Sequence, residues 1–163
     1  MSIAKRLKEY LDREKVLYEV LTHNQAHTAS ELAQALHMPG NELAKVVILR
    51  VGERFVMTVL PANLKIEVKH LRDLFQTHAV RLATEEEFKT LFPDCELGAM
   101  PPFGNLYGLE VYVDECLTTS EDIVFQAGTS SEAMKLRYRT FANLVRPLVA
   151  ELHMPSSWSK TSS

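Results

Sequence analysis

The chain has 163 residues, of which 46% are hydrophobic, and its formal net charge at pH 7 is -3. A chain of this size can bury a core without disulfides or metals, so we expect one domain over residues 1–154 and a disordered, serine-rich tail over 155–163. The acidic balance excludes a protein that coats nucleic acid, because such proteins need surplus Lys and Arg to displace counterions. Local contact with a nucleic acid end remains open.

Cysteine usage and hydropathy bear on the compartment. Cys95 and Cys116 form no CxxC pair, which is typical of free thiols in a reducing compartment. No window approaches the roughly 18 apolar residues of a membrane span, and no apolar stretch follows the basic residues near the N-terminus. We therefore expect a cytoplasmic protein that does not enter a membrane.

Hydrophobic periodicity predicts alternating helices and strands in the first half of the chain. The elements expected are a surface helix over 3–11, a strand over 17–21, a helix opened by a Thr28/Glu31 capping box and stopped by Pro39 and Gly40, and a hairpin of strands 43–51 and 55–60 around Gly52 and Glu53.

The second half continues in the same mixed manner. The elements expected are a helix over 68–75, a strand over 80–83, a helix from a Thr84/Glu87 capping box to about residue 92, strands over 109–113 and 123–127, a polar turn over 128–131, a strand over 133–138 and a closing helix over 141–148. Strands that arrive as a hairpin and singly between helices indicate a mixed α/β or α+β sheet.

Lys45 lies in the middle of the most apolar stretch, Leu43 to Leu49, whose composition predicts a strand buried on both faces. An ammonium group is costly there unless a partner compensates for its desolvation. Period-two geometry places it with Val47 and Leu49, so we expect it to project into a core or cleft and to meet an anionic or strongly polarised ligand group. The alternative is that the strand begins at Val46 and the amine reaches water at its mouth.

Other segments fit no secondary-structure period. Gly98 to Gly104 contains Pro101 and Pro102, which exclude a continuous helix or ladder and predict a rigid loop. No Gly-rich nucleotide fingerprint follows a predicted strand.

The sequence does not match the common patterns of metal-binding or nucleophilic catalytic residues. His23 and His27 are four residues apart, but Asn24 stands where a zinc-protease pattern needs glutamate, and the pair precedes its helix. No GxSxG elbow is present, and neither cysteine stands beside a histidine in sequence, although pairing in space stays open. We expect no metal and no cofactor.

Several short segments occur along the chain in an order and spacing that resembles the YbaK family, the editing domains associated with prolyl-tRNA synthetase and their free-standing relatives. They are His27-Thr28, Lys45, Val59-Leu60-Pro61-Ala62, Leu82-Ala83-Thr84, the Gly98–Gly104 loop and Phe125-Gln126-Ala127-Gly128. The resemblance covers residues 17–145.

The resemblance implies a fold, an activity and a set of site residues. The implied fold is α/β (α+β), a mixed, partly barrel-like β-sheet flanked by helices, and the implied activity is hydrolysis of the ester between a wrong amino acid and the end of tRNA. The implied catalytic residues are Lys45 and Gly98, at the start of the GxxxP loop. The substrate-binding candidates are His23, His27, Thr28, Met57, Ala99, Met100, Pro101, Pro102, Phe103, Gly128, Thr129 and Ser130. A later polar residue of some relatives has no clear match, Lys135 and Arg137 being nearest.

These residues suit ester hydrolysis. Backbone N–H groups of Gly98 and Ala99 can stabilise the negative charge that develops on the carbonyl oxygen, while Lys45 neutralises the terminal phosphate or orients the carbonyl. Water attacks, helped by the neighbouring ribose hydroxyl, and positioning supplies much of the acceleration.

The expected function is therefore a free-standing deacylase that acts in trans on the acceptor end of mischarged tRNA, with an aminoacyl-tRNA synthetase as a further partner. The alternatives are a non-catalytic module that binds aminoacyl-tRNA or a synthetase through the same cleft, and a hydrolase of other small esters or amides. The amino acid, the tRNA and the oligomeric state stay open.

Overall fold

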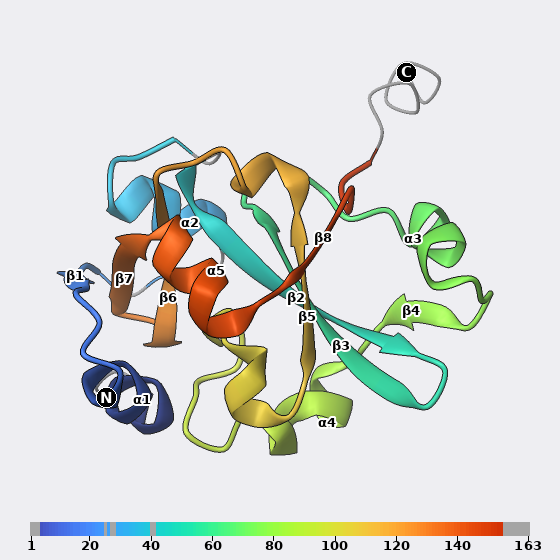
Figure 1. Ribbon diagram of the computed structural model, residues 1–163, viewed down its shortest axis with the longest axis horizontal. Helices are drawn as coiled ribbons and strands as arrows, with labels where there is room; N and C mark the ends of the chain where they lie inside the picture. Colours follow the sequence, from blue (N-terminus) through green and yellow to red (C-terminus); the bar gives the residue numbers. More distant parts are fainter. Residues whose placement is uncertain (1–3, 25, 27–28, 40–41, 155–163) are drawn as a thin grey trace.

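The computed structural model describes residues 4–24, 26, 29–39 and 42–154. Its strands form two sheets flanked by helices (Figure 1). The three-stranded antiparallel sheet has the order β1-β7-β6 and consists of β1 (Glu19–Thr22), β6 (Asp122–Thr129) and β7 (Glu132–Arg137). The five-stranded sheet has the order β4-β2-β3-β5-β8 and consists of β2 (Ala44–Val51), β3 (Arg54–Pro61), β4 (Val80–Leu82), β5 (Glu110–Asp114) and β8 (Leu148–Ala150).

The larger sheet is mixed. Strand β2 pairs antiparallel with β3 and β4, whereas β5 pairs in parallel with β3 and β8. A parallel bridge between Leu43 and Val124 links the two sheets, which do not close into a barrel within the described residues. The predicted mixed α+β fold is confirmed. None of the helices in the described ranges is long and apolar enough to cross a membrane.

Five α-helices lie among the described residues. They are α1 (Lys5–Arg13), α2 (Ala29–Ala35), α3 (Val68–Phe75), α4 (Glu85–Phe88) and α5 (Tyr138–Val145). The capping box that opens α4 is formed as predicted: Thr84 Oγ1 accepts from Glu87 N at 3.3 Å, and Glu87 Oε1 accepts from Thr84 N at 2.9 Å. The Arg81 guanidinium, together with Thr84, lowers the pKa of Glu87 to about 2. The Thr28/Glu31 box falls on Thr28, outside the described residues.

Strand β2 is buried on both faces, as its apolar run predicts. Ala44 and Ile48 belong to the main core, which includes the aromatic side chains of Phe103, Phe125 and Phe141. Leu49 and Val51 pack instead in a second cluster with Leu71 of α3. A third, smaller cluster joins Leu32 of α2 to Leu43 and Val124. The start of β2 therefore lies where the two sheets and α2 meet.

Three expectations about the elements are wrong. Gly128 and Thr129 continue β6 through a register irregularity, and the turn falls on Ser130 and Ser131. The closing helix ends at Val145, and Leu148 begins β8 instead. The α-helix after Thr84 ends at Phe88 and continues only as a 3-10 turn over Lys89–Leu91.

Candidate active site

Lys45 is the second residue of β2, directly opposite Leu60 of β3. The strand begins at Ala44, so the alternative start at Val46 is wrong. The lysine is half-buried and lies on the wall of a cavity of about 140 Å³. The cavity is lined by Leu32, Ala44, Lys45, Val46, Gly98, Met100 and Gln126. The two residues predicted to be catalytic thus share one small cavity.

The electrostatics of this cavity are positive. Burial lowers the pKa of Lys45, and the nearby charge of Lys65 lowers it further. No carboxylate in the described part of the chain contributes to the pKa of Lys45. An ammonium group without a compensating anion, beside a second lysine, suits an anionic ligand group such as a phosphate.

The glycine loop presents one amide with a weak partner. Gly98 has a positive φ of 87°, and its N–H donates to the thioether Sδ of Met100 at 3.3 Å, a poor acceptor. The Ala99 N–H already donates to the Glu96 carbonyl at 3.1 Å. Of the two amides expected to stabilise an oxyanion, that of Gly98 is therefore the easier to redirect to a ligand.

The loop is held against the end of β6 by backbone hydrogen bonds. Gly128 N donates to the Ala99 carbonyl at 2.7 Å, and Glu96 N donates to the Gly128 carbonyl at 2.8 Å. The Glu96 carboxylate also accepts from Ser130 N at 2.7 Å. These bonds fix the position of Gly98 relative to the sheet, which is the preorganisation that an oxyanion site requires.

We expect Gly128→Ala to destabilise the protein by about 2–4 kcal/mol, because it combines overpacking with an unfavourable backbone conformation. Gly128 has a φ of +96°, and an added Cβ would lie 2.5 Å from Ala4 Cβ and 3.0 Å from Ala4 N. Gly108→Ala is the matched control, since Gly108 also has a positive φ (+72°) but no atom within 4 Å of the added Cβ. Urea unfolding measures both. Equal losses in the two variants would contradict the close approach of Ala4.

The other residues predicted to bind substrate lie in different parts of the structure, and few of them line the cavity. Met100 lines the cavity, whereas Met57 is fully buried in the main core and is not among the lining residues. Pro101, Pro102 and Phe103 are buried, and the Phe103 ring packs 5.7 Å from that of Phe125 and 5.5 Å from that of Phe141. They anchor the loop.

The remaining candidates lie near the end of β6 or outside the described residues. Gly128, Thr129 and Ser130 do not line the cavity. The backbone N–H of His23 donates to the Ser131 carbonyl at 3.0 Å, and its ring Nδ1 lies 2.6 Å from the Asn24 carbonyl oxygen. Its buried Nε2 meets no partner within the described ranges. His27 and Thr28 lie outside those ranges.

Gln126 is a site residue that the sequence reasoning missed. Its side chain is buried and lines the cavity with Lys45. Nε2 donates to the Ala26 carbonyl at 2.9 Å. The amide oxygen accepts no hydrogen bond from the described residues. A polar side chain inside the apolar strand 123–127 is the same kind of signal that identified Lys45.

The two cysteines are free and poorly suited to be nucleophiles. Burial raises the pKa of Cys95 to about 12, and burial with the neighbouring Asp114 raises that of Cys116 to about 11. Cys116 does approach a histidine in space, because ligand atoms of Asp114, Cys116 and His153 lie within 4.8 Å of one another. A thiol with such a pKa is protonated at neutral pH and is a weak nucleophile.

The Asp114, Cys116 and His153 group is the one set of three possible metal ligands found among the described residues. However, Asp114 Oδ1 accepts from Cys116 N at 2.8 Å, and Oδ2 accepts from Leu152 N at 2.9 Å and His153 N at 3.0 Å. His153 Nδ1 lies 2.8 Å from Oδ2. These bonds explain the group as a structural attachment of the segment after β8.

Lys135 and Arg137, the nearest matches to the later polar residue of some relatives, lie away from the cavity. Both form ion pairs with Asp122, at 3.8 Å and 3.9 Å. Neither is among the residues that line the cavity around Lys45. Neither residue is therefore a clear structural counterpart of the later polar residue found in some relatives.

Comparison with known proteins defines the class to which this fold and cavity belong. The family model described as aminoacyl-tRNA editing domain matches residues 23–144, and the chain belongs to this family. It is 26% identical to the proline--tRNA ligase of Bacillus cytotoxicus over 106 residues, which are 65% of this chain and 18% of the ligase. The corresponding ligase of Bacillus cereus strain AH187 is 24% identical over 108 residues, or 66% and 19% of the two chains. The chain thus matches about a fifth of the length of these synthetases.

Solved structures show the same fold. A hypothetical protein superposes with a TM-score of 0.82 at 18% identity, covering 92% of this chain and 100% of that one. A provisionally assigned trans-editing enzyme for prolyl-tRNA synthetase superposes with a TM-score of 0.79 at 21% identity, covering 93% and 97%. The resemblance to the YbaK-like editing domains is confirmed.

Proposed function

We propose that this protein is a trans-acting aminoacyl-tRNA deacylase, which hydrolyses the ester of mischarged tRNA in the cytoplasm as part of translation quality control. The observation that supports it most is that Lys45 and the Gly98 amide line one small, positively charged cavity. Membership of the aminoacyl-tRNA editing family supports the same class of substrate.

In this proposal the acceptor end of tRNA enters the cavity with its aminoacyl ester at Gly98. The Gly98 N–H leaves the Met100 thioether and donates to the developing oxyanion. The Lys45 ammonium neutralises the terminal phosphate or orients the ester carbonyl, and Lys65 adds to the positive field. Water attacks the ester with the help of the adjacent ribose hydroxyl, so the protein contributes mainly position and charge.

Gln126 has a positioning role in the same proposal. Its Nε2 is held by the Ala26 carbonyl, so its amide oxygen is available to accept from the α-ammonium group of the aminoacyl ester. We expect Gln126→Leu to lower kcat/KM for deacylation by about tenfold, the effect of losing one hydrogen bond to a charged group. The measurement is steady-state deacylation with urea unfolding alongside. An unchanged kcat/KM in a folded variant would contradict this role.

Two measurements on the wild-type protein test the proposed reaction. Release of the amino acid from mischarged tRNA should exceed the spontaneous rate, and the methyl ester of the same amino acid should be cleaved much more slowly, because it lacks the tRNA end that Lys45 and Lys65 would bind. Equal cleavage of both esters would instead favour a hydrolase of small esters.

The net charge of -3 favours a second candidate, a non-catalytic module that holds aminoacyl-tRNA or a synthetase partner through the same cleft. An acidic protein binds tRNA weakly without help. This candidate predicts protection of the ester rather than its hydrolysis, so the wild-type deacylation rate separates the two functions.

A further inference from the structure

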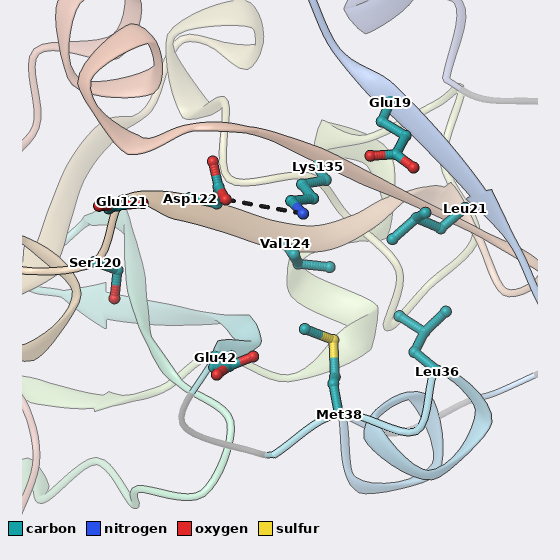
Figure 2. A pocket seen from close by; sticks show the side chains of 10 residues that line it. All are labelled: Glu19, Leu21, Leu36, Met38, Glu42, Ser120, Glu121, Asp122, Val124 and Lys135. Atoms are coloured by element: carbon teal, nitrogen blue, oxygen red, sulfur yellow. Dashed lines mark ion pairs between the residues drawn. The ribbon is translucent and has the colours of Figure 1, made fainter.

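A second cavity of about 450 Å³, larger than the one at Lys45, is shown in Figure 2. It is lined by Glu19, Leu21, Leu36, Met38, Glu42, Ser120, Glu121, Asp122, Val124 and Lys135. The two cavities share no residue but involve adjoining segments: Leu32 of α2 and Gln126 of β6 line the smaller one, and Leu36, which directly follows α2, and Val124 of β6 line the larger. The proposed deacylase reaction uses none of the residues of the larger cavity.

Three neighbouring strands form one wall of this cavity. Glu19 of β1 and Val124 of β6 lie on either side of Lys135 of β7, each in direct register with it. Leu21 follows Glu19 by two residues and so projects from the same face of β1. Leu36 and Met38, which follow α2, and Glu42, which precedes β2, face these strands across the cavity (Figure 2).

The charge of the lining is strongly negative. It contains four carboxylates, of Glu19, Glu42, Glu121 and Asp122, and one ammonium group, of Lys135. Lys135 lies 3.8 Å from Asp122, and Arg137 lies 3.8 Å from Glu121. Glu19 and Glu42 form no ion pair within the described ranges of the chain. Such a lining repels the phosphates of RNA and attracts a cation.

Of the five other lining residues, four are apolar, namely Leu21, Leu36, Met38 and Val124, and the fifth is Ser120. A lining that combines aliphatic side chains with carboxylates fits the long side chains of lysine and arginine, which pack an apolar stem and present a cationic end. Methionine adds an adaptable surface of the kind found at peptide-binding sites.

Strand β1 also favours a polypeptide over a small cation. It is the edge of its sheet and pairs only with β7 among the described residues. A free strand edge can pair with the backbone of an extended segment, and alternate side chains of that segment then enter a neighbouring pocket. Val20 of the same strand and Leu17 just before it are exposed apolar side chains.

We propose that this cavity binds an extended, lysine- or arginine-bearing segment of a partner protein. The segment lies along β1, its aliphatic stems pack on Leu36 and Met38, and its cationic ends pair with Glu19 and Glu42. The site is independent of the reaction proposed at Lys45, so it can be tested by binding alone.

The test is a calorimetric and NMR titration of the full chain with the acetylated, amidated tetrapeptide Leu-Lys-Leu-Lys. Binding should shift the signals of Leu21, Met38 and Val124, and the double variant Glu19→Gln/Glu42→Gln should weaken it by about tenfold. Glu14→Gln/Glu53→Gln is the matched control, because it removes the same charge from exposed residues outside the cavity and should leave affinity unchanged.

Three outcomes would overturn the proposal. They are no binding of the tetrapeptide, equal weakening by the cavity and control variants, and equal affinity for spermidine, which would indicate general attraction of cations. The Leu-Glu-Leu-Glu peptide should not bind, since its carboxylates would face those of the cavity. Thermal unfolding of each variant establishes that it is folded.

Discussion

Lys45→Met is expected to lower the rate of deacylation by at least about a hundredfold, the effect of removing one group that stabilises developing charge, without reducing the stability of the protein. The lysine is half-buried in an apolar strand and receives no compensating carboxylate among the described residues. Its lowered pKa means that folding disfavours the charged form. Methionine keeps the length of the side chain and removes the desolvated charge, so the melting temperature should stay the same or rise.

Single-turnover deacylation and thermal unfolding of the same preparation check both halves of this prediction. Lys69→Met is the matched control, because Lys69 is an exposed lysine on α3 and its loss should leave the rate unchanged. A folded Lys45→Met protein with the wild-type rate would show that the charge is not used. A large loss of stability would show that Lys45 serves the fold.

Asp114→Asn is expected to destabilise the protein by about 2–4 kcal/mol, because it places an amide where several N–H donors point at a buried carboxylate. Asp114 is fully buried at the end of β5. It accepts the backbone N–H groups of Cys116, Leu152 and His153, and the His153 ring lies 2.8 Å away. These bonds attach the segment after β8 to the sheet.

This contribution should depend on pH with a defined sign. Burial alone would raise the pKa of Asp114, but hydrogen bonds from Cys116, His153 and Leu152 outweigh it and lower the pKa below the ordinary value of 3.8. A depressed carboxyl pKa stabilises the folded state above the unfolded value and loses that effect as the pH falls towards the folded value. The wild type should therefore lose more stability than Asp114→Asn between pH 5 and pH 2.

Urea unfolding over this pH range measures the difference. The control is Asp73→Asn, an exposed carboxylate on α3, which should change stability by less than about 0.5 kcal/mol. Parallel pH curves for the wild type and Asp114→Asn would contradict the role assigned to the hydrogen bonds of Asp114.

The elements predicted correctly from the sequence are those with strong local signals. The hairpin around Gly52 and Glu53 joins two apolar strands, and the helix over 68–75 has regular helical spacing. Strand β8 has neither signal, since Leu148 and Val149 are exposed and its parallel pairing with β5 depends on Asp114, far away in sequence. Tertiary contacts of this kind leave no local pattern to recognise.

The residues of the site likewise divide into those with a local sequence signal and those without one. Lys45 could be found because a charge inside an apolar run is anomalous wherever the run lies in the fold. Gln126 gives the same signal, because it is a polar residue inside the apolar strand β6, and it could be found in the same way. Lys65 could not be found, because its effect on Lys45 is electrostatic and acts across the fold between β2 and the segment after β3. The larger acidic cavity is assembled from β1, β6, β7 and the ends of α2 and β2, so no single segment predicts it.

The most direct test of the proposed function is deacylation of a panel of tRNAs mischarged with Ala, Ser, Cys or Pro, measured with the wild-type protein against the spontaneous rate. We expect one or a few of these esters to be cleaved well above the spontaneous rate, because the small cavity at Lys45 accepts a limited range of side chains. Spontaneous rates for every ester, at protein concentrations that saturate tRNA binding, would contradict it and leave the binding module as the function of this cleft.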